Sequence, residues 1–320
     1  MKIAFVDDYC HKKTNSTNFL VNILKKEFEI KRFWRNGIIT FPNYNIVEIN
    51  KWNPDKIIFF QRIPIFTILK KFNCKKFIFI PMYDSKGFFN IKKNPINLFR
   101  SIFLKVNDII TDLLFKTKFI TFSNSDFKDF SKRGKTILLN YYPKPKKQVQ
   151  QKKPILFFWE RVDSLPFSKL MKIINFNKFE KIYFMQRNDD GSECLHHSFY
   201  DLPKNVIVID KWLSKNEYEK IMNKTNIAVA PRLCEGIGHS FLDYMSRGIC
   251  VFAFNDSTHN EYIKHEINGL LFKDYDNLIN FQNWKKLGKN ARKSIKNGYV
   301  DWELNKHKLI NWITYLDKPK

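Results

Sequence analysis

The sequence is poor in the features that mark several common classes of protein. Its 320 residues include only ten glycines and five cysteines. The cysteines form no Cys-x-x-Cys pair and share no metal-ligand spacing with histidine, which argues against a disulfide scaffold and against a structural zinc site. No apolar run approaches the ~18 residues that a membrane-spanning helix needs. Residues 1–8 indicate a strand followed by acids rather than a signal peptide. We therefore expect a cytoplasmic protein that does not cross a membrane.

Acidic residues are few relative to basic ones. The chain has 31 Asp and Glu against 56 Lys and Arg, a formal net charge of +25. Residues 1–150 hold 29 basic and 11 acidic residues, whereas residues 151–320 hold 27 and 20. A basic first half rich in Phe favours an anionic partner: nucleic acid, an anionic membrane face or a phosphorylated acceptor. The alternative is codon bias from an AT-rich gene, which places the lysines on solvated faces without a partner.

Apolar runs typical of buried strands alternate with helical patterns along the whole chain. Strands are expected at 2–6, 55–61, 76–81, 119–123, 136–140, 155–159, 181–185, 205–209, 226–230 and 248–254. Helices are expected at 17–28, from 95 to 113 and at 302–316. A Pro- and Lys-rich stretch at 141–154 separates two such series and is typical of an interdomain linker.

This alternation predicts an α/β protein with two parallel-sheet domains. We expect the first domain at 1–148, the second at 149–300 and a final helix at 301–320 that packs back across the domain junction. Because ligands of open parallel sheets bind at the carboxyl ends of the strands, functional residues are expected just after the strands, in a cleft between the domains.

The most specific local feature is the segment 235–243, Glu-Gly-Ile-Gly-His-Ser-Phe-Leu-Asp. It follows the predicted strand 226–230 and opens a helix with apolar periodicity over 240–248. Unpaired amides at the start of a helix suit a phosphate, and glycines let the backbone approach a ligand closely. A solvated acid followed by a helix-terminal charge gives the same spacing, so the pattern alone leaves both interpretations open.

The segment and its surroundings resemble the Glu-x7-Glu signature of retaining GT-B glycosyltransferases of family 4. The similarity extends in the family's order over about seventy residues, in the stretches 205–210, 217–222, 226–231, 235–243, 245–253, 261–263 and 268–272. It implies the GT-B fold, with two Rossmann-like domains facing a central cleft. It also implies transfer of a hexose from a nucleotide diphosphate sugar with retention of configuration, without a metal ion or other cofactor.

The resemblance also implies roles for single residues of the second domain. Glu235 would contact hydroxyls of the donor sugar as part of the catalytic site. The backbone of Gly236, Ile237 and Gly238 would hold the same sugar. Asp243, at the position of the second Glu, would take the ribose.

The diphosphate has its own set of expected contacts. Amides near Ser240 and Phe241 would bind it, and Arg161 matches the family's phosphate-binding Arg. Arg232 lies beside Glu235 in the sequence and is placed to neutralise phosphate charge. Fixed positive groups lower the barrier because negative charge builds on the leaving diphosphate.

The sequence departs from the family in three places. Asp243 replaces Glu and is shorter by one methylene. The Gly-rich turn after the first strand is absent, and residues 7–17 stand there instead. The Lys that follows the phosphate-binding Arg has no clear equivalent, and Lys169 is a candidate at an unusual distance.

The acceptor half carries weaker signals. In the family, a His or Asp near the end of strand 76–81 often lies beside the reacting carbon, and Asp84 is our choice for that catalytic position. A turn or helix cap is the alternative role for Asp84. His11 and Asp8, at the end of the first strand, are second choices.

Aromatic and basic residues are mixed in the segment 88–105. One interpretation is a core helix with a solvated rim. The other is docking on an anionic membrane through Phe88, Phe89, Lys92, Lys93 and Arg100. The second interpretation allows a peripheral protein at the inner membrane face.

Together these observations predict a metal-independent, retaining hexosyltransferase. Its partners would be a nucleotide sugar and a glycan or lipid-linked acceptor, in the assembly of surface polysaccharide or lipopolysaccharide. Two alternatives stay open: a nucleic-acid-binding protein that uses the basic half, and an inactive GT-B scaffold. The sequence contains no recognised nucleic-acid module and its basic residues are dispersed, so we expect no nucleic acid partner.

Overall fold

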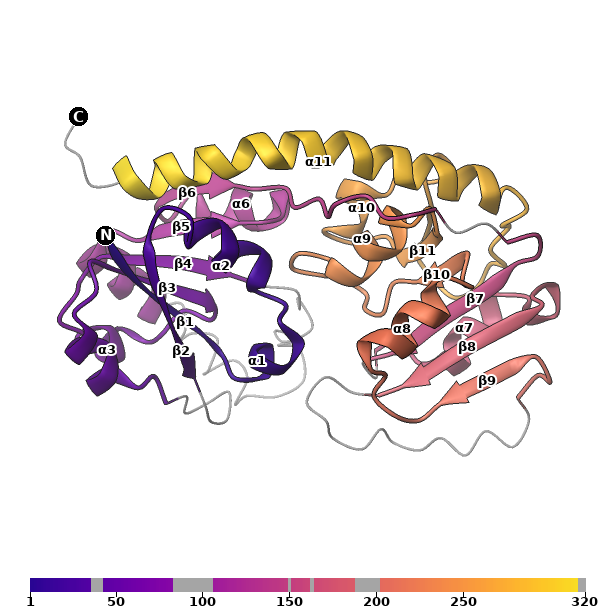
Figure 1. Cartoon of the computed structure of the whole chain (residues 1–320), viewed down its shortest axis with the longest axis horizontal. Helices are drawn as coiled ribbons and strands as arrows, with labels where there is room; N and C mark the ends of the chain where they lie inside the picture. The colour runs from indigo at the N-terminus through magenta and orange to yellow at the C-terminus, as the bar shows by residue number, and fades with distance from the viewer. Residues whose placement is uncertain (36–42, 83–105, 149–150, 162–163, 188–201, 316–320) are drawn as a thin grey trace. The chain divides into compact units, whose positions relative to one another are not determined.

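The computed structural model describes residues 1–35, 43–82, 106–148, 151–161, 164–187 and 202–315 (Figure 1). The chain divides into two compact units, Met1–Asn140 with Glu303–Lys320, and Tyr141–Trp302. Each unit contains one six-stranded parallel sheet with helices. The predicted α/β class with two parallel sheets is therefore confirmed. None of the helices in the described ranges is both long and apolar enough to cross a membrane.

The sheet of the first unit has six parallel strands. Along the sheet its strands are β2 (Glu29–Arg35), β1 (Lys2–Asp8), β3 (Lys56–Gln61), β4 (Phe77–Pro81), β5 (Lys118–Thr121) and β6 (Lys135–Leu138). The helices are α1 (Cys10–Thr14), α2 (Asn18–Leu24), α3 (Ile46–Trp52), α4 (Phe66–Leu69) and α6 (Asn124–Phe130), and residues 106–115 are also helical.

The sheet of the second unit is built in the same manner. Along it lie β12 (Leu270–Phe272), β11 (Cys250–Phe254), β10 (Ile227–Val229), β7 (Ile155–Glu160), β8 (Lys181–Gln186) and β9 (Val206–Ile209). The helices are α7 (Phe167–Ile173), a 3-10 turn (Phe176–Lys178), α8 (Lys215–Met222), α9 (His239–Ser246), α10 (His259–Tyr262) and the long α11 (Trp284–Tyr315).

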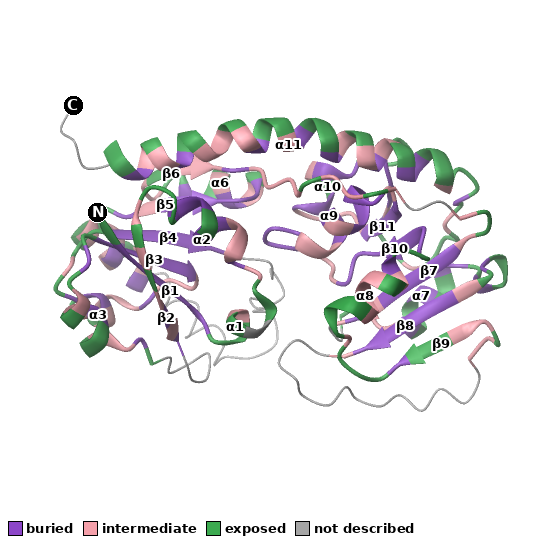
Figure 2. Ribbon diagram, in the orientation of Figure 1, coloured by how far each residue is buried: buried purple, intermediate pink, exposed green. Residues whose placement is uncertain are grey.

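Burial on both faces explains why the strands are almost continuously apolar. In β7, Ile155 and Phe157 pack into one hydrophobic cluster, whereas Leu156 and Phe158 pack into another. Side chains alternate between the faces of a strand, so each cluster covers one face of the sheet. Figure 2 shows the inner strands of both sheets as buried, whereas the edge strands β2, β6 and β9 are largely intermediate or exposed.

The strand order fixes where a ligand should bind in each unit. In the second unit the chain runs outward from β7 through β8 to β9, then returns to β10 and continues the other way. Such a reversal opens a crevice at the carboxyl ends of the two strands that flank it, here β7 and β10. The corresponding reversal in the first unit lies between β1 and β3.

Helix α11 is longer than predicted. The expected span of 302–316 covers only its second part, because Gly288 and Gly298 weaken the helical pattern before Trp302. Both glycines lie where a Cβ would collide, Gly288 with the carbonyl of Gly248 and Gly298 with the ring of Tyr142. The glycines therefore allow close packing instead of ending the helix. As predicted, the last part of α11 belongs to the first unit, where the ammonium of Lys56 donates to the carbonyl of Ile313.

Residues 141–148 and 151–154, the described part of the predicted linker, belong to the second unit. Tyr141 packs edge-on against His239 and Trp302, with ring centroids 4.8 and 5.2 Å apart. The backbone of Lys146 donates to Ser246 and accepts from the guanidinium of Arg292. The Pro and Lys residues of this stretch are therefore compatible with an extended chain that lies against α9 and α11 and forms no helix or strand.

Candidate functional site

The loop that follows β10 leads directly into helix α9. Glu235 is 7 % exposed, and Gly236, Ile237 and Gly238 are also buried. Gly238 has a φ of 82°, and a Cβ there would lie 2.0 Å from a ring carbon of Phe241. Only glycine fits this backbone and this contact. The close approach seats the loop on the first turn of α9, which begins at His239.

The start of α9 has no side-chain cap. The N-cap residue is Gly238, and no side chain there accepts from the first amides of the helix. The early backbone N–H groups and the helix dipole give this end a partial positive charge, which favours a phosphate. Ser240 is half-buried in the first turn, and the Phe241 side chain is fully buried beneath it. The amides of these two residues are therefore the expected diphosphate contacts.

Three of the predicted donor residues act electrostatically on one buried phenol. Burial raises the pKa of Tyr244, the carboxylates of Asp243 and Glu235 raise it further, and the Arg161 guanidinium opposes them. These interactions place Arg161, Glu235 and Asp243 within electrostatic reach of one point. They come from the ends of β7 and β10 and from α9, and so they surround the reversal of the strand order.

An aromatic side chain supports Arg161. The guanidinium lies over the ring of Trp159, 4.8 Å from its centroid, and the Trp159 indole donates to the carbonyl of Arg187. Stacking on an aromatic face orients a guanidinium without using up its N–H groups. Arg232 is half-buried in the loop that also carries Glu235. Lys169 is exposed on α7, with its ammonium 5.3 Å from the centroid of the Tyr275 ring.

Asp243 lies in a network of charges that the sequence did not indicate. Its carboxylate is 2.8 Å from the ammonium of Lys146 and accepts from the Arg247 guanidinium at 3.0 Å. The Tyr218 hydroxyl donates to it at 3.3 Å. A ribose diol that binds Asp243 must therefore share the carboxylate with these donors or displace one. Lys146 is the most easily displaced, because its side chain is 41 % exposed.

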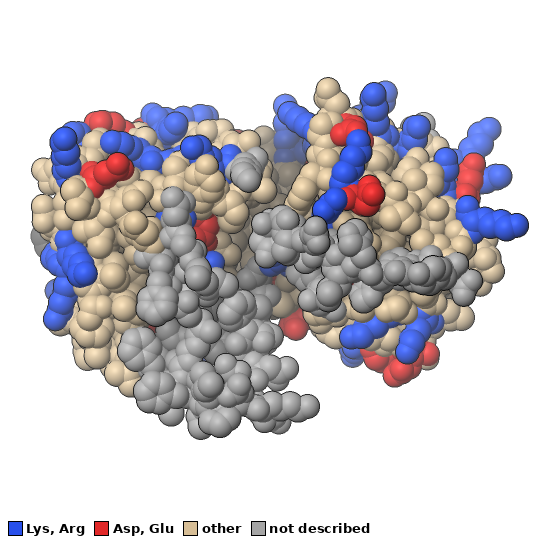
Figure 3. Space-filling view, turned by 90° about the horizontal axis from the view of Figure 1, so that it is seen from below, with Lys and Arg blue, Asp and Glu red and all other residues tan. Residues whose placement is uncertain are grey.

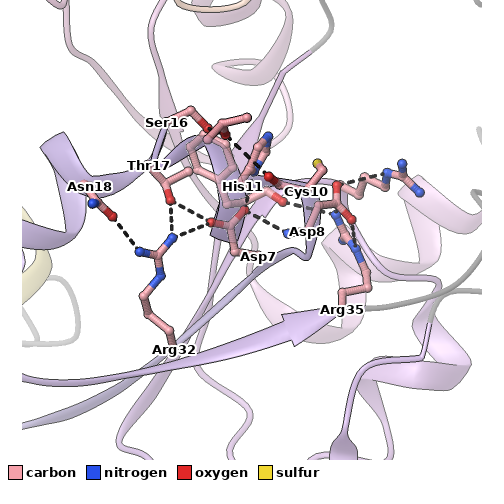
Figure 4. A network of polar contacts seen from close by, with 12 residues as sticks. Asp7, Asp8, Cys10, His11, Ser16, Thr17, Asn18, Arg32 and Arg35 are labelled. Carbon is pink, nitrogen blue, oxygen red and sulfur yellow. Dashed lines mark hydrogen bonds and ion pairs between the residues drawn. The ribbon is translucent and has the colours of Figure 1, made fainter. Parts of the chain in front are cut away.

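In the first unit, two acids and three arginines gather at the carboxyl ends of β1, β2 and β3. Figure 4 shows Asp7 between Thr17, Arg32 and His11. Its carboxylate accepts from Thr17 at 2.7 Å and Arg32 at 3.0 Å and lies 2.6 Å from His11 Nδ1. Asp8 is paired with Arg35 at 2.6 Å and with Arg62 at 3.5 Å.

These ion pairs decide what His11 and Asp8 do at neutral pH. Burial alone lowers the pKa of His11, but hydrogen bonds to Asp7 and Cys10 and the Asp7 charge outweigh it and raise the pKa to about 10. A protonated imidazole donates hydrogen bonds and cannot act as a general base. His11 is therefore suited to charge stabilisation rather than to proton abstraction, and Asp8 is ion-paired with both Arg35 and Arg62.

Several predicted residues lie outside the described residues. These are Asp84 and the segment 88–105 with Phe88, Phe89, Lys92, Lys93 and Arg100. Within the described ranges, no group of three or more His, Cys, Asp or Glu side chains could hold a metal ion.

The basic residues do not form one continuous patch on the face shown in Figure 3. Lys and Arg side chains are spread over both units there and are interspersed with acidic and neutral ones. Some of the positive charge is internal to the fold, because Arg35 and Arg247 are each 2 % exposed.

The contributions of β2 and α8 to these sites were not predicted. Arg32 and Arg35 lie on β2, a partly buried strand in which charged and apolar residues are mixed without regular alternation. Arg247 is four residues after Asp243, and this spacing on a helix signals an ion pair. Glu219 and Tyr218 are distant in the sequence, and only the packing of α8 against α9 brings them to Asp243.

Comparison with known proteins identifies the fold. Residues 188–299 match the family described as Glycosyl transferases group 1. That match covers about a third of the chain and includes the loop with Glu235. No curated protein matches the sequence.

Solved structures match over nearly the whole chain. Sucrose-phosphate synthase from Thermosynechococcus elongatus has a TM-score of 0.69 and 14 % identity, covering 99 % of this chain and 100 % of that one. HepE from Anabaena, solved with UDP-glucose, has a TM-score of 0.64 and 13 % identity, covering 97 % and 99 %. WaaB, a lipopolysaccharide outer core galactosyltransferase, has a TM-score of 0.52 and 14 % identity, covering 93 % and 91 %. The predicted GT-B fold is therefore confirmed.

Proposed function

We propose that the chain is a glycosyltransferase that moves a hexose from a nucleotide diphosphate sugar to an acceptor hydroxyl. The observation that carries the proposal is that Arg161 follows β7 and Glu235 follows β10, the two strands that flank the reversal of the second sheet, while Asp243 lies on the helix that the Glu235 loop opens. Those three side chains offer a cation and two carboxylates beside a helix N-terminus, which matches a diphosphate flanked by a sugar and a ribose. HepE, with the same fold, was solved with UDP-glucose.

The buried loop would hold the donor sugar. Glu235 accepts hydrogen bonds from sugar hydroxyls, and the backbone of Gly236, Ile237 and Gly238 lies close enough for main-chain contacts. A carboxylate accepts two or more hydroxyl hydrogen bonds, and burial of the site strengthens them. This arrangement fixes the sugar's anomeric carbon relative to the leaving phosphate.

Positive groups would stabilise the leaving nucleotide. When the sugar–phosphate bond breaks, negative charge appears on the diphosphate oxygens. Arg161, Arg232 and the amides of Ser240 and Phe241 are the groups that meet this charge. Preorganised donors of this kind lower the barrier by several kcal/mol, on the order of 3 kcal/mol for one donor. The reaction then needs no metal ion, and we propose metal-independent transfer.

Retention of configuration and a role for Asp84 beside the reacting carbon rest on the resemblance to family 4. The basic first unit favours an anionic acceptor, such as a lipid-linked or surface glycan carrying phosphate. WaaB acts on lipopolysaccharide and shares the fold, which supports surface polysaccharide or lipopolysaccharide assembly as the setting, with the protein peripheral on the inner membrane face. Nucleic-acid binding is not favoured.

A nucleotide-sugar panel tests the proposal. Wild type should be thermally stabilised by one nucleotide diphosphate hexose and should hydrolyse it slowly without acceptor. Glu235→Ala and Glu235→Gln should lose at least about 100-fold in turnover, as expected for removal of a main transition-state contact. Glu217→Ala is the control, because Glu217 caps α8 without belonging to the site.

Two results would contradict the proposal. If wild type binds no nucleotide and no nucleotide sugar, the enzyme function fails. If it binds the donor but neither hydrolyses nor transfers it with any acceptor, the inactive GT-B scaffold becomes the better description. Addition of EDTA should leave turnover unchanged, and loss of turnover with EDTA would refute metal independence.

A further inference from the structure

The loop between β11 and α10 contains a strained threonine. Thr258 has φ 70° and ψ −50° and is fully buried. A β-branched residue at positive φ is a genuine outlier, and such backbone costs roughly 1–3 kcal/mol. Glycine would adopt this conformation without that cost, so something about the threonine side chain must offset the strain.

The side chain has one specific partner. The Thr258 hydroxyl donates to the backbone carbonyl of Glu235, in the loop that follows the neighbouring strand β10. The adjacent residue, His259, reinforces the contact between the two loops. Its Nδ1 lies 3.0 Å from the carbonyl of Phe254, and its ring packs edge-on against Phe241 at 5.0 Å. Thr258 thus holds the Glu235 loop through the Glu235 carbonyl. His259 holds it through the ring of Phe241, against which Gly238 packs.

The position of this hydrogen bond matters because a peptide group is rigid. The carbonyl of Glu235 and the amide N–H of Gly236 belong to one planar, trans unit and point in opposite directions. By holding the carbonyl, Thr258 fixes the direction of the Gly236 N–H, which points away from Thr258. A misplacement of about 1 Å in such a group costs about 100-fold in rate in well-organised sites.

We infer that Thr258 is a positioning residue that sets the Glu235–Gly236 peptide for recognition of the donor sugar. This inference rests on the proposed function, since it assumes that the Glu235 loop holds the sugar. The strained backbone at Thr258 is retained because the hydroxyl, which glycine lacks, orients the backbone N–H of Gly236. The nucleotide, held elsewhere, does not depend on it.

Variants at Thr258 separate the hydroxyl from the strain. Thr258→Val keeps the shape and loses the hydroxyl, Thr258→Ser keeps the hydroxyl, and Thr258→Gly removes the strain and the hydroxyl together. Thr225→Val is a matched control, because Thr225 is also fully buried and donates to a backbone carbonyl, that of Ile221 at 3.0 Å, at the end of α8. Thr225→Val therefore measures the general effect of losing a hydroxyl hydrogen bond to a buried backbone carbonyl.

Calorimetric titration with UDP-glucose and with UDP gives the decisive comparison. Thr258→Val and Thr258→Gly should bind UDP-glucose about 10-fold more weakly, as expected for one displaced main-chain donor, while their affinity for UDP changes less than about threefold. Thr258→Ser and Thr225→Val should bind both ligands like wild type. Thr258→Gly should change stability little, because the release of strain is opposed by the loss of the hydrogen bond to Glu235 and by the greater freedom of glycine in the unfolded chain.

The outcomes are distinguishable. Unchanged binding of UDP-glucose by Thr258→Val, with wild type binding it, overturns the positioning role and leaves the proposed function intact. If Thr258→Val loses affinity equally for UDP and for UDP-glucose, the residue has only a structural role and the positioning role is overturned. The same holds if Thr225→Val loses as much affinity for UDP-glucose as Thr258→Val does. If Thr258→Val does not fold, Thr258→Ala against Thr258→Ser makes the same comparison. Failure of wild type to bind UDP, UDP-glucose and every other nucleotide sugar of the panel is a failure of the proposed function.

Discussion

Arg247 binds Glu219 through both terminal nitrogens of its guanidinium. The Nη1–Oε2 and Nη2–Oε1 distances are both 2.7 Å, and the pair joins the end of α9 to α8. The Nε of the same guanidinium donates to Asp243 at 3.0 Å. One arginine that is 2 % exposed therefore fixes both the helix with the donor residues and the orientation of Asp243.

Arg247→Met should destabilise the protein. We expect a loss of about 2 kcal/mol, below the ~3–5 kcal/mol of a fully buried pair, because Glu219 is 36 % exposed and water can replace the arginine. Urea unfolding of wild type and Arg247→Met measures this loss of unfolding free energy. The control is Lys211→Ala, which removes the exposed pair with Glu217 and should cost less than about 1 kcal/mol. Equal losses in the two variants would contradict a structural role for Arg247.

His11 should make stability depend on pH. Its pKa is raised to about 10 in the folded state, against about 6.5 for an unfolded chain. The unfolded state therefore loses the proton first, so the stabilisation is complete below about pH 6.5 and declines as pH rises toward 10. His11→Gln should remove this contribution.

The difference in unfolding free energy between wild type and His11→Gln isolates the effect, because all other titrating groups are shared. That difference should shrink steadily between pH 6.5 and 10. A difference that stays constant over this range would show that the Asp7–His11 pair does not hold the proton. Chemical shifts of the His11 ring carbons, followed over the same range, report the titration directly.

Local sequence patterns were enough to place most strands and the Glu235 loop. The strands are short apolar runs whose burial on both faces leaves a clear signal, and Glu235 follows β10 within a few residues. The crevice between β7 and β10 is then a consequence of strand order, which the alternation of strands and helices predicts only in outline.

Interactions between distant segments could not be predicted. Lys146 reaches Asp243, and Glu219 reaches Arg247, only because the extended segment and α8 pack on α9. The strained backbone of Thr258 is invisible in a sequence, where threonine at a turn has no special meaning. Gly298 weakened the helical pattern of α11, although it fits against Tyr142. In each case the missing information is tertiary packing.

Gly238→Ala should damage both stability and donor binding. The new methyl lies 2.0 Å from the Phe241 ring, and the φ of 82° is unfavourable for alanine. We expect about 1–3 kcal/mol of destabilisation and weaker binding of the donor, because the loop must move off α9. Thermal unfolding and nucleotide-sugar titration measure the two effects.

Gly298→Ala provides the matched comparison. A Cβ at Gly298 also collides, 2.3 Å from a ring carbon of Tyr142, but on α11 rather than in the donor loop. It should lower stability and leave nucleotide-sugar affinity within about threefold of wild type, since the Glu235 loop is untouched. Loss of binding in Gly298→Ala, or its retention in Gly238→Ala, would argue against the loop as the sugar site.

Asp243 should recognise the ribose in competition with Lys146. Wild type should bind UDP more tightly than 2′-deoxy-UDP, by about 10-fold for a hydrogen bond to a charged acceptor. Asp243→Asn should reduce this preference to near unity, because the charged acceptor is gone. Lys146→Met should increase the preference for UDP, because the ammonium 2.8 Å from the carboxylate no longer competes.

Asp210→Asn changes an exposed acid of the same unit and should behave like wild type. If the ratio of the two affinities is the same in wild type, Asp243→Asn and Lys146→Met, then Asp243 serves only to anchor Arg247, and the ribose is bound elsewhere.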